Sequence, residues 1–208
     1  HPLWEEACKR VIENLGFPWQ GKNFMRFGSL TEIWENYTSY MNYQLGVPVP
    51  TLVSQTKSKF LKSFVSADPD ELLVDGFFSF ANELINRREF KIGLVSNTDR
   101  DVGEAILKHL NIAHLFQVIV FGDDVKNKKP APDVYNKALK SLNVKSRNAL
   151  AIEDSPTGIK SAEAANLDFI VVKNPLYSER DYGGERLVFV PDFTVFLGNM
   201  DKTPKEAA

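Results

Sequence analysis

From residue 76 onward, short apolar runs alternate with segments of helical periodicity. The apolar runs are continuous, as in Lys91-Ile-Gly-Leu-Val-Ser96 and Asp168-Phe-Ile-Val-Val172. Continuous apolar strands are typical of a parallel sheet that helices cover on both faces. The strand candidates lie at 91–96, 117–121, 149–153, 168–172 and 187–190. This alternation predicts an α/β fold built on a parallel sheet.

The first 75 residues follow a different pattern, because they contain helical spacing and no strand candidate. Apolar residues recur at helical spacing over 3–15, 33–41 and 53–64. Ser29 and Glu32 have the spacing of a capping box at the start of the second of these helices. The sequence therefore predicts an all-helical unit over 1–75 and an α/β unit over 76–208.

Composition excludes several classes of protein. A formal net charge of -2 over 208 residues gives no field that would attract nucleic acid or an anionic membrane. No apolar run reaches the roughly 18 residues of a membrane-spanning helix. The one cysteine, Cys8, lies on an apolar helical stripe, which predicts a core side chain and fits a reducing, cytoplasmic compartment. We expect no nucleic-acid partner and no membrane partner.

Polar residues follow three of the predicted strands. Ser96-Asn97-Thr98, Lys128-Lys129 and Glu153-Asp154 each come at or just after a strand end. Parallel strands deliver their carboxyl ends to one edge of a sheet, so these residues are expected to converge. Hydroxyl, amide and backbone N–H groups at a helix start bind anions, whereas adjacent carboxylates attract a cation. The pattern predicts a phosphate beside a divalent cation such as Mg²⁺.

Each of these segments also has an ordinary structural interpretation. Ser96-Asn97-Thr98 has the composition of a helix N-cap, and the two lysines and two acids have the composition of solvated loops. Any one of them alone favours that interpretation. Their order on successive strands favours a shared binding site instead.

The combination of three motifs resembles the haloacid dehalogenase superfamily, and within it the β-phosphoglucomutase-like phosphatases with a helical cap. The motifs are Leu94-Val-Ser-Asn-Thr98, Lys129-Pro-Ala-Pro-Asp133 and Ile152-Glu-Asp-Ser-Pro-Thr-Gly158. The resemblance implies a Rossmann-like core over 76–208 with the helices of 1–75 as an inserted cap. One position departs from the family: Asn166 replaces a usual glycine, and asparagine tolerates the left-handed conformation.

The resemblance also implies roles for individual residues. Ser96 and Asn97 would bind the transferring phosphoryl group, and Lys129 would steady that group as a catalytic residue. Glu153 and Asp154 would hold Mg²⁺.

Two choices among basic residues remain open. Lys128 is an alternative to Lys129, which we prefer because it directly precedes the proline, as in the family. In the cap, Lys22 and Arg26 are candidates for substrate contact, with Asn36 and Lys57 as further polar candidates, although a solvated helix face explains each of them more simply.

The activity implied is Mg²⁺-dependent phosphoryl transfer, most simply hydrolysis of a small phosphate ester such as a sugar phosphate. A small phosphorylated metabolite would then be the partner. Two alternatives stay open: a phosphosugar mutase of the β-phosphoglucomutase type, and a non-catalytic relative that binds phosphate or a partner. Carbon–halogen displacement is disfavoured, because that chemistry needs no pair of metal ligands at 153–154.

The first motif of the family, a strand ending in Asp-x-Asp-Gly, does not occur in the sequence. Its first aspartate attacks phosphorus and its second acts as general acid and base. Asp68-Pro-Asp70 has the spacing, but no apolar strand precedes it. The family places that strand between 92–95 and 149–153, so without it these two would lie about 10 Å apart. We expect the nucleophile upstream, and these 208 residues alone to be inactive or severely impaired.

Overall fold

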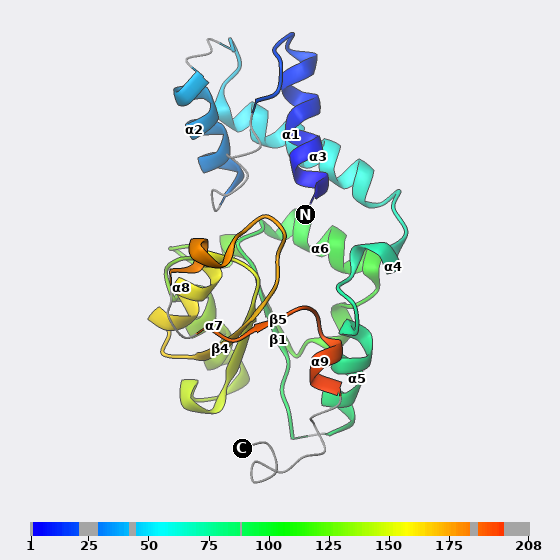
Figure 1. The fold of residues 1–208 in the computed structure, drawn as a ribbon, viewed down its shortest axis with the longest axis vertical. Coiled ribbons are helices and arrows are strands. Elements are labelled where there is room, and N and C mark those ends of the chain that lie inside the picture. The colour runs from blue at the N-terminus through cyan, green and yellow to red at the C-terminus, as the bar shows by residue number, and fades with distance from the viewer. Residues whose placement is uncertain (1, 21–28, 42–44, 88, 184–186, 198–208) are drawn as a thin grey trace.

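The computed structural model describes residues 2–20, 29–41, 45–87, 89–183 and 187–197. Three helices form a unit at one end of the molecule, and a layered α/β unit forms the rest (Figure 1). The helices are α1 (Pro2–Asn14), α2 (Leu30–Met41) and α3 (Val49–Phe64), and we call them the helical unit. The short α4 (Pro69–Leu72) follows them and leads into the α/β unit.

The helical unit has its own apolar core. Cys8, Val11, Trp34 and Leu52 are buried there, from α1, α2 and α3. The indole Nε1 of Trp34 donates a hydrogen bond of 3.1 Å to Oγ1 of Thr56, so the polar atom of this large buried ring is satisfied.

The α/β unit alternates helix and strand along the chain. Its elements are α5 (Phe77–Asn86), β1 (Gly93–Val95), α6 (Arg100–Leu110), β2 (Val118–Val120), α7 (Asp133–Leu142), β3 (Leu150–Glu153), α8 (Pro156–Ala164), β4 (Asp168–Val172), β5 (Phe189–Val190) and α9 (Thr194–Leu197). Short 3-10 turns lie at 113–115, 122–124, 146–148 and 179–182.

All described strands run parallel, but they form two sheets. β1 pairs with β2, aligning Leu94 with Ile119, and β3, β4 and β5 form the second sheet in that order. Among the described strands, β1 and β3 do not pair with each other. Residues of both strands line one cavity of about 1420 Å³.

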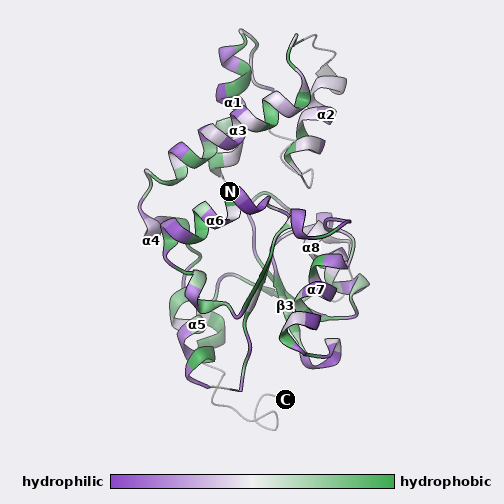
Figure 2. Cartoon of the chain, turned by 180° about the vertical axis from the view of Figure 1, so that it is seen from behind, coloured by the Kyte–Doolittle hydropathy of each residue, from purple (hydrophilic) through white to green (hydrophobic). Residues whose placement is uncertain are grey.

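Helices cover the strands on both sides. α7 and α8 lie against one side of the strands, and α5, α6 and α9 lie on the other (Figure 1). The strands are strongly hydrophobic ribbons between helices of mixed polarity (Figure 2). This burial on both faces explains why the strand sequences are continuous apolar runs.

One apolar cluster joins the helical unit to the α/β unit. Phe60 and Phe64, from the C-terminal half of α3, pack with Val102 and Leu107 of α6. The ring of Trp4 in α1 stacks on Phe60 at 3.6 Å between centroids. α3 therefore belongs to two cores, one at each of its ends.

Most predicted elements are present, with shorter strands than the apolar runs suggested. β4 has the predicted bounds, and each of the other strands is shorter than predicted by one or two residues at one or both ends. Asn166 has φ 54°, which confirms its left-handed conformation, and Cys8 is fully buried, which confirms it as a core side chain. Within the described residues, no helix is both long enough and apolar enough to span a bilayer.

Candidate functional site

The predicted site residues meet at the carboxyl ends of β1 and β3. Ser96, Asn97, Lys129, Glu153 and Asp154 all line the same cavity between the two sheets. The first two follow β1, Lys129 lies in the loop between β2 and α7, and the acids end β3. The carboxyl ends of the strands thus bring together side chains that are far apart in sequence.

Lys129 and Glu153 form a buried ion pair. Their side chains are only 8% and 6% exposed, and Nζ of Lys129 contacts Oε1 of Glu153. The hydroxyl of Tyr135, from α7, donates to the same carboxylate oxygen. Nζ of Lys129 also donates to the carbonyl oxygen of Val95 at 3.3 Å and lies 5.1 Å from the centre of the Tyr135 ring. The ammonium is therefore held in one place by its partners on β1, β3 and α7.

The environment of Tyr135 keeps its hydroxyl protonated. Burial raises the pKa of this phenol far above its ordinary value, and the negative charge of Glu153 raises it further. A protonated phenol donates to the carboxylate, so Glu153 receives one neutral and one charged donor. Such satisfaction is what makes a buried carboxylate tolerable.

Asn97 holds the loop that carries Lys129. Its Oδ1 accepts the backbone N–H of Lys129 at 2.7 Å, and its Nδ2 donates to the carbonyl of Lys129 at 3.0 Å. Both polar atoms of the side-chain amide thus bond to the backbone of Lys129, and what Asn97 can still offer an anion is its backbone N–H and the second proton on Nδ2. The residue was predicted from sequence as a phosphate ligand, and its side chain here has a positioning role.

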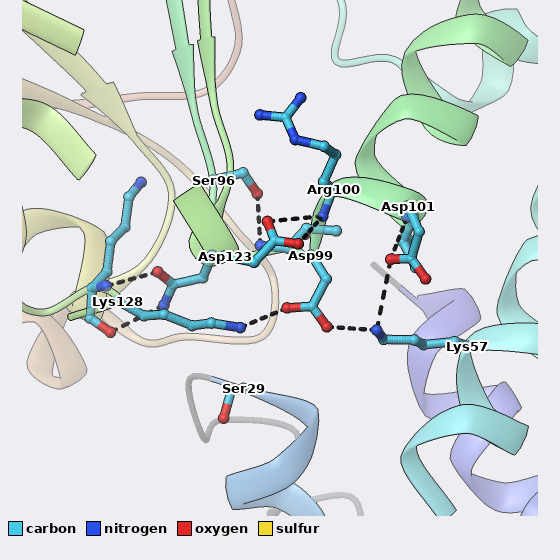
Figure 3. A network of polar contacts seen from close by, with 12 residues as sticks. Ser29, Lys57, Ser96, Asp99, Arg100, Asp101, Asp123 and Lys128 are labelled. Carbon is cyan, nitrogen blue, oxygen red and sulfur yellow. Dashed lines mark hydrogen bonds and ion pairs between the residues drawn. The ribbon is translucent and has the colours of Figure 1, made fainter. Parts of the chain in front are cut away.

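Ser96 keeps its hydroxyl proton available. Its Oγ accepts the backbone N–H of Thr98 at 3.1 Å, a turn that leads into α6 (Figure 3). An oxygen that accepts in this way still carries one proton to donate. Ser96 therefore has the chemistry to donate to an anion in the cavity.

Asp154 differs from its neighbour in exposure and in partners. It is exposed, and its Oδ2 accepts a hydrogen bond of 2.9 Å from Nδ2 of Asn174, which follows β4. Its backbone carbonyl accepts from the hydroxyl of Tyr182 at 2.9 Å. Burial and the nearby Asp154 charge raise the pKa of Tyr182 to about 12. The two acids of the pair therefore diverge, Glu153 to Lys129 and Asp154 to Asn174.

Gly158 makes room for the carboxylate of Glu153. A Cβ at this position in the first turn of α8 would lie 1.8 Å from Oε2 of Glu153. Ser155 caps the same helix by accepting the backbone N–H of Gly158 at 3.1 Å, and Pro156 occupies its first position. The Ser-Pro-Thr-Gly segment thus ends the strand, starts the helix and leaves space for Glu153.

The residues present fit a loosely held Mg²⁺ better than a closed metal cage. The described residues contain no cluster of three or more His, Cys, Asp or Glu side chains suited to a metal ion. Asp154 is exposed and has an oxygen, Oδ1, with no hydrogen bond to another described residue, whereas Glu153 is bound to Lys129 and Tyr135. Mg²⁺ commonly takes one or two carboxylates and fills its other positions with water and phosphate oxygens.

The remaining candidates lie elsewhere. Lys128 does not belong to the cavity lining, and its Nζ lies 2.6 Å from Oδ1 of Asp99. Asp68 is the N-cap of α4 and accepts the backbone N–H of Asp70 at 3.0 Å, so this Asp-x-Asp pair serves a helix start. Lys22 and Arg26 lie outside the described residues.

Sequence reasoning assigned no role to Tyr135 or Asn174, and it included Gly158 in the third motif without identifying its contact with Glu153. Asn174 follows the end of β4, so the strand-edge rule that found the other residues applies to it as well. Tyr135 falls between the apolar residues Val134 and Ala138, and a tyrosine there has the appearance of core. No signal in the sequence distinguishes it.

Comparison with known proteins gives a consistent result. The sequence profile of the haloacid dehalogenase-like hydrolases matches residues 2–172. The chain is 28% identical to a phosphorylated carbohydrates phosphatase of Thermotoga maritima, over 81% of the chain and 76% of that protein. It is 30% identical to the fructose-1-phosphate phosphatase YqaB of Escherichia coli, over 60% of the chain and 63% of that protein.

Among solved structures, the chain resembles CbbY of Rhodobacter sphaeroides in complex with xylulose-(1,5)bisphosphate. The TM-score is 0.76 at 22% identity, covering 92% of this chain and 88% of that one. At this identity the likeness shows the fold alone.

Proposed function

The chain belongs to the haloacid dehalogenase-like hydrolases, and on that premise we propose that its site serves Mg²⁺-dependent hydrolysis of a small phosphate ester, such as a sugar phosphate. The observation that carries the proposal is the convergence of Ser96, Lys129 and Asp154 on one cavity. The names of the relatives favour a phosphorylated carbohydrate as substrate.

Each residue has a role that follows from its contacts. The hydroxyl of Ser96 and the backbone N–H of Asn97 donate to the phosphoryl oxygens, and the ammonium of Lys129 offsets their charge. Asn97 and Glu153 position Lys129 from its backbone and from its side chain. Asp154 would hold Mg²⁺, while Glu153, which was predicted as the second ligand, stays with Lys129 and Tyr135 as a positioning acid. The metal would supply charge that stabilises the phosphoryl oxygens as the ester bond breaks.

The sequence does not contain the Asp-x-Asp-Gly motif, which supplies the attacking aspartate in the family. Glu153 is occupied by Lys129 and Tyr135, and Asp154 cannot ligate a metal and attack phosphorus in line at once. We therefore propose that these 208 residues bind phosphate with Mg²⁺ but turn over esters slowly or not at all. This absence is also what favours the second candidate, a phosphate-binding relative without catalysis.

Two measurements on the chain test these proposals. Titration with inorganic phosphate should show binding that Mg²⁺ strengthens, and Asp154→Asn should remove the effect of Mg²⁺. Glu163→Gln is the matched control, because Glu163 is an exposed acid of α8 that does not belong to the cavity lining. A wild-type chain that binds no phosphate, or an Asp154→Asn variant with unchanged Mg²⁺ dependence, would contradict the assignment.

The second measurement is turnover of fructose 1-phosphate and other sugar phosphates with Mg²⁺. Negligible turnover alongside clear phosphate binding is the expected result. Turnover at a rate ordinary for enzymes, around 1–1000 per second, would contradict the proposed lack of an attacking group.

A further inference from the structure

We propose that Asp99 is a positioning residue that fastens the helical unit to the loop carrying Lys129. Asp99 lies three residues after Ser96, at the start of α6, and its carboxylate lies between two lysines from different parts of the molecule (Figure 3). One is Lys57 of α3, and the other is Lys128, which immediately precedes Lys129. We call these three residues the Asp99 clasp.

The side chain of Asp99 does not cap the helix that it precedes. Asp99 is the N-cap residue of α6, where an aspartate usually accepts a backbone N–H from the first turn, yet its side chain makes no such bond. Asp123, from the loop after β2, accepts the N–H of Arg100 with both oxygens at 3.1 Å. Asp101 accepts the N–H of Val102 at 2.8 Å. Other acids cap the helix, so the Asp99 carboxylate is available to the lysines.

The carboxylate of Asp99 pairs with one lysine at each of its two oxygens. Oδ2 of Asp99 lies 2.5 Å from Nζ of Lys57, and Oδ1 lies 2.6 Å from Nζ of Lys128, so each oxygen takes one ammonium. The Lys57 and Asp99 side chains are 22% and 29% exposed. An exposed ion pair contributes little to stability. The Lys128 side chain is more exposed, at 39%, but one carboxylate shared by two cations also offsets their mutual repulsion.

The two lysines belong to different elements, Lys57 to α3 and Lys128 to the loop that carries Lys129. Lys57 lies one turn before Phe60, which packs on α6, and beside Thr56, which lies in the core of the helical unit. The clasp thus lies at the end of the α3–α6 contact that faces the site. On the other side, Asn97 already holds the backbone of Lys129, so Lys128 and Lys129 are fixed from two directions.

These contacts predict that the position of the helical unit and the position of Lys129 depend on each other. Removing the Asp99 charge leaves the ammonium groups of Lys57 and Lys128 facing each other, with Asp101 of α6, 3.6 Å from Nζ of Lys57, as a weaker acidic partner of Lys57. The repulsion between the two ammonium groups separates α3 from the loop. The apolar packing of Phe60 and Phe64 on α6 remains, so the helical unit stays in contact with the α/β unit but moves over a wider range relative to it. The link to Lys129 rests on the function proposed above; the mechanical link does not.

A distance measurement tests the mechanical link. Nitroxide labels at Ser54→Cys on α3 and Asn136→Cys on α7 lie at exposed positions, while the native Cys8 is buried. The distance distribution should shift to longer values and broaden in Asp99→Asn and Lys57→Met. It should be unchanged in the control Lys62→Met, which removes an exposed lysine of the same helix. Asparagine is as good an N-cap as aspartate, so α6 should stay intact.

Titration with inorganic phosphate and Mg²⁺ tests the link to Lys129. Asp99→Asn and Lys57→Met should weaken phosphate binding by at least about fivefold, and Lys57→Arg, which keeps the charge, should restore it. Lys62→Met should bind as the wild type does.

The two readouts separate the possible failures. Identical distance distributions in the wild type and Asp99→Asn would overturn the clasp. Altered distances with unchanged phosphate affinity would overturn its coupling to Lys129. A wild-type chain that binds no phosphate would overturn the proposed function, and the label distances would still decide the clasp.

Discussion

Glu153 and Asp154 are adjacent in sequence, yet their side chains have different environments and different chemistry. Successive side chains of a strand point to opposite sides, so the buried Glu153 meets Lys129 and the exposed Asp154 meets Asn174. The repulsion expected between neighbouring carboxylates is relieved on one side by the Lys129 ammonium. The pair is thus one positioning acid and one acid available to a cation.

Two tyrosines give a matched test of this difference. Tyr135→Phe removes a donor to the charged, buried Glu153, and Tyr182→Phe removes a donor to the neutral carbonyl of Asp154. Hydrogen bonds to charged groups contribute more, so we expect losses in the free energy of unfolding of about 1.5–3 kcal/mol for Tyr135→Phe and about 0.5–1.5 kcal/mol for Tyr182→Phe. Urea denaturation of both variants measures the difference. Equal losses, or a larger loss for Tyr182→Phe, would contradict the buried ion-pair assignment.

Sequence reasoning at the residue scale worked where position along the chain decides the outcome. The convergence of Ser96, Lys129 and Asp154 on one cavity could be predicted because the carboxyl ends of parallel strands share an edge. It did not find the partners, because which atoms meet depends on side-chain direction and on helices packed from the other side. Tyr135 reaches Glu153 from α7, and the side-chain amide of Asn97 turns to the backbone of Lys129.

At the scale of elements, α3 is the helix whose two ends belong to different cores. Its N-terminal half packs within the helical unit through Leu52, and its C-terminal half packs on α6 through Phe60 and Phe64. The apolar spacing of 53–64 predicted the helix but not this division, because periodicity identifies a buried face and not its partner. The short α4 and α9, of four residues each, are below the length at which periodicity is visible.

The α3–α6 contact should depend on pH through the Asp99 clasp. Burial of Asp99 raises its pKa, but hydrogen bonds from Lys128 and Lys57 outweigh this and hold the pKa below the ordinary 3.8. Burial of Lys57 lowers its pKa, but the hydrogen bond and charge of Asp99, together with a smaller effect of Asp101, outweigh this and hold the pKa above 10.5. A lowered acid pKa gives stability that is lost as pH falls below 3.8, and a raised lysine pKa gives stability that is lost as pH rises above 10.5.

The stability difference between the wild type and Asp99→Asn therefore has a defined pH window. We expect it to be constant from about pH 5 to pH 9, to shrink below about pH 4 as Asp99 protonates, and to shrink again above about pH 11 as Lys57 deprotonates. Thermal unfolding of both proteins across this range measures it. A difference that persists undiminished at pH 2 would mean that the effect does not arise from the charge of Asp99.

At the scale of the whole molecule, the two sheets should differ from one continuous sheet in the protection of their amides. The N–H of Ser96 bonds to β2, and alternation along β1 then turns the N–H groups of Gly93 and Val95 toward the cavity. The N–H groups of Val171 and Lys173 bond to the β5 side, so the alternate residues of β4 bond to β3. With the observed β3–β4 register, the N–H groups of Ala151 and Glu153 then face β4, and those of Leu150 and Ile152 face the cavity. Every second amide on these two strands thus faces the space between the sheets.

Hydrogen exchange measured residue by residue tests this alternation. Amides of Leu94, Ser96, Ala151 and Glu153 should exchange slowly, and those of Gly93, Val95, Leu150 and Ile152 should exchange faster. Uniform protection along both strands would contradict the separation into two sheets.

Two strand edges that pair with no other described strand would ordinarily invite aggregation, since an open edge is a template for pairing with another chain. Here the edges of β1 and β3 face the same cavity, and residues of α5 and α7, such as Leu84 and Leu142, line it as well. A second folded molecule cannot present a flat edge to strands that helices cover in this way. The arrangement that leaves the backbone groups unpaired also shields them, and it admits a single extended strand more readily than another sheet.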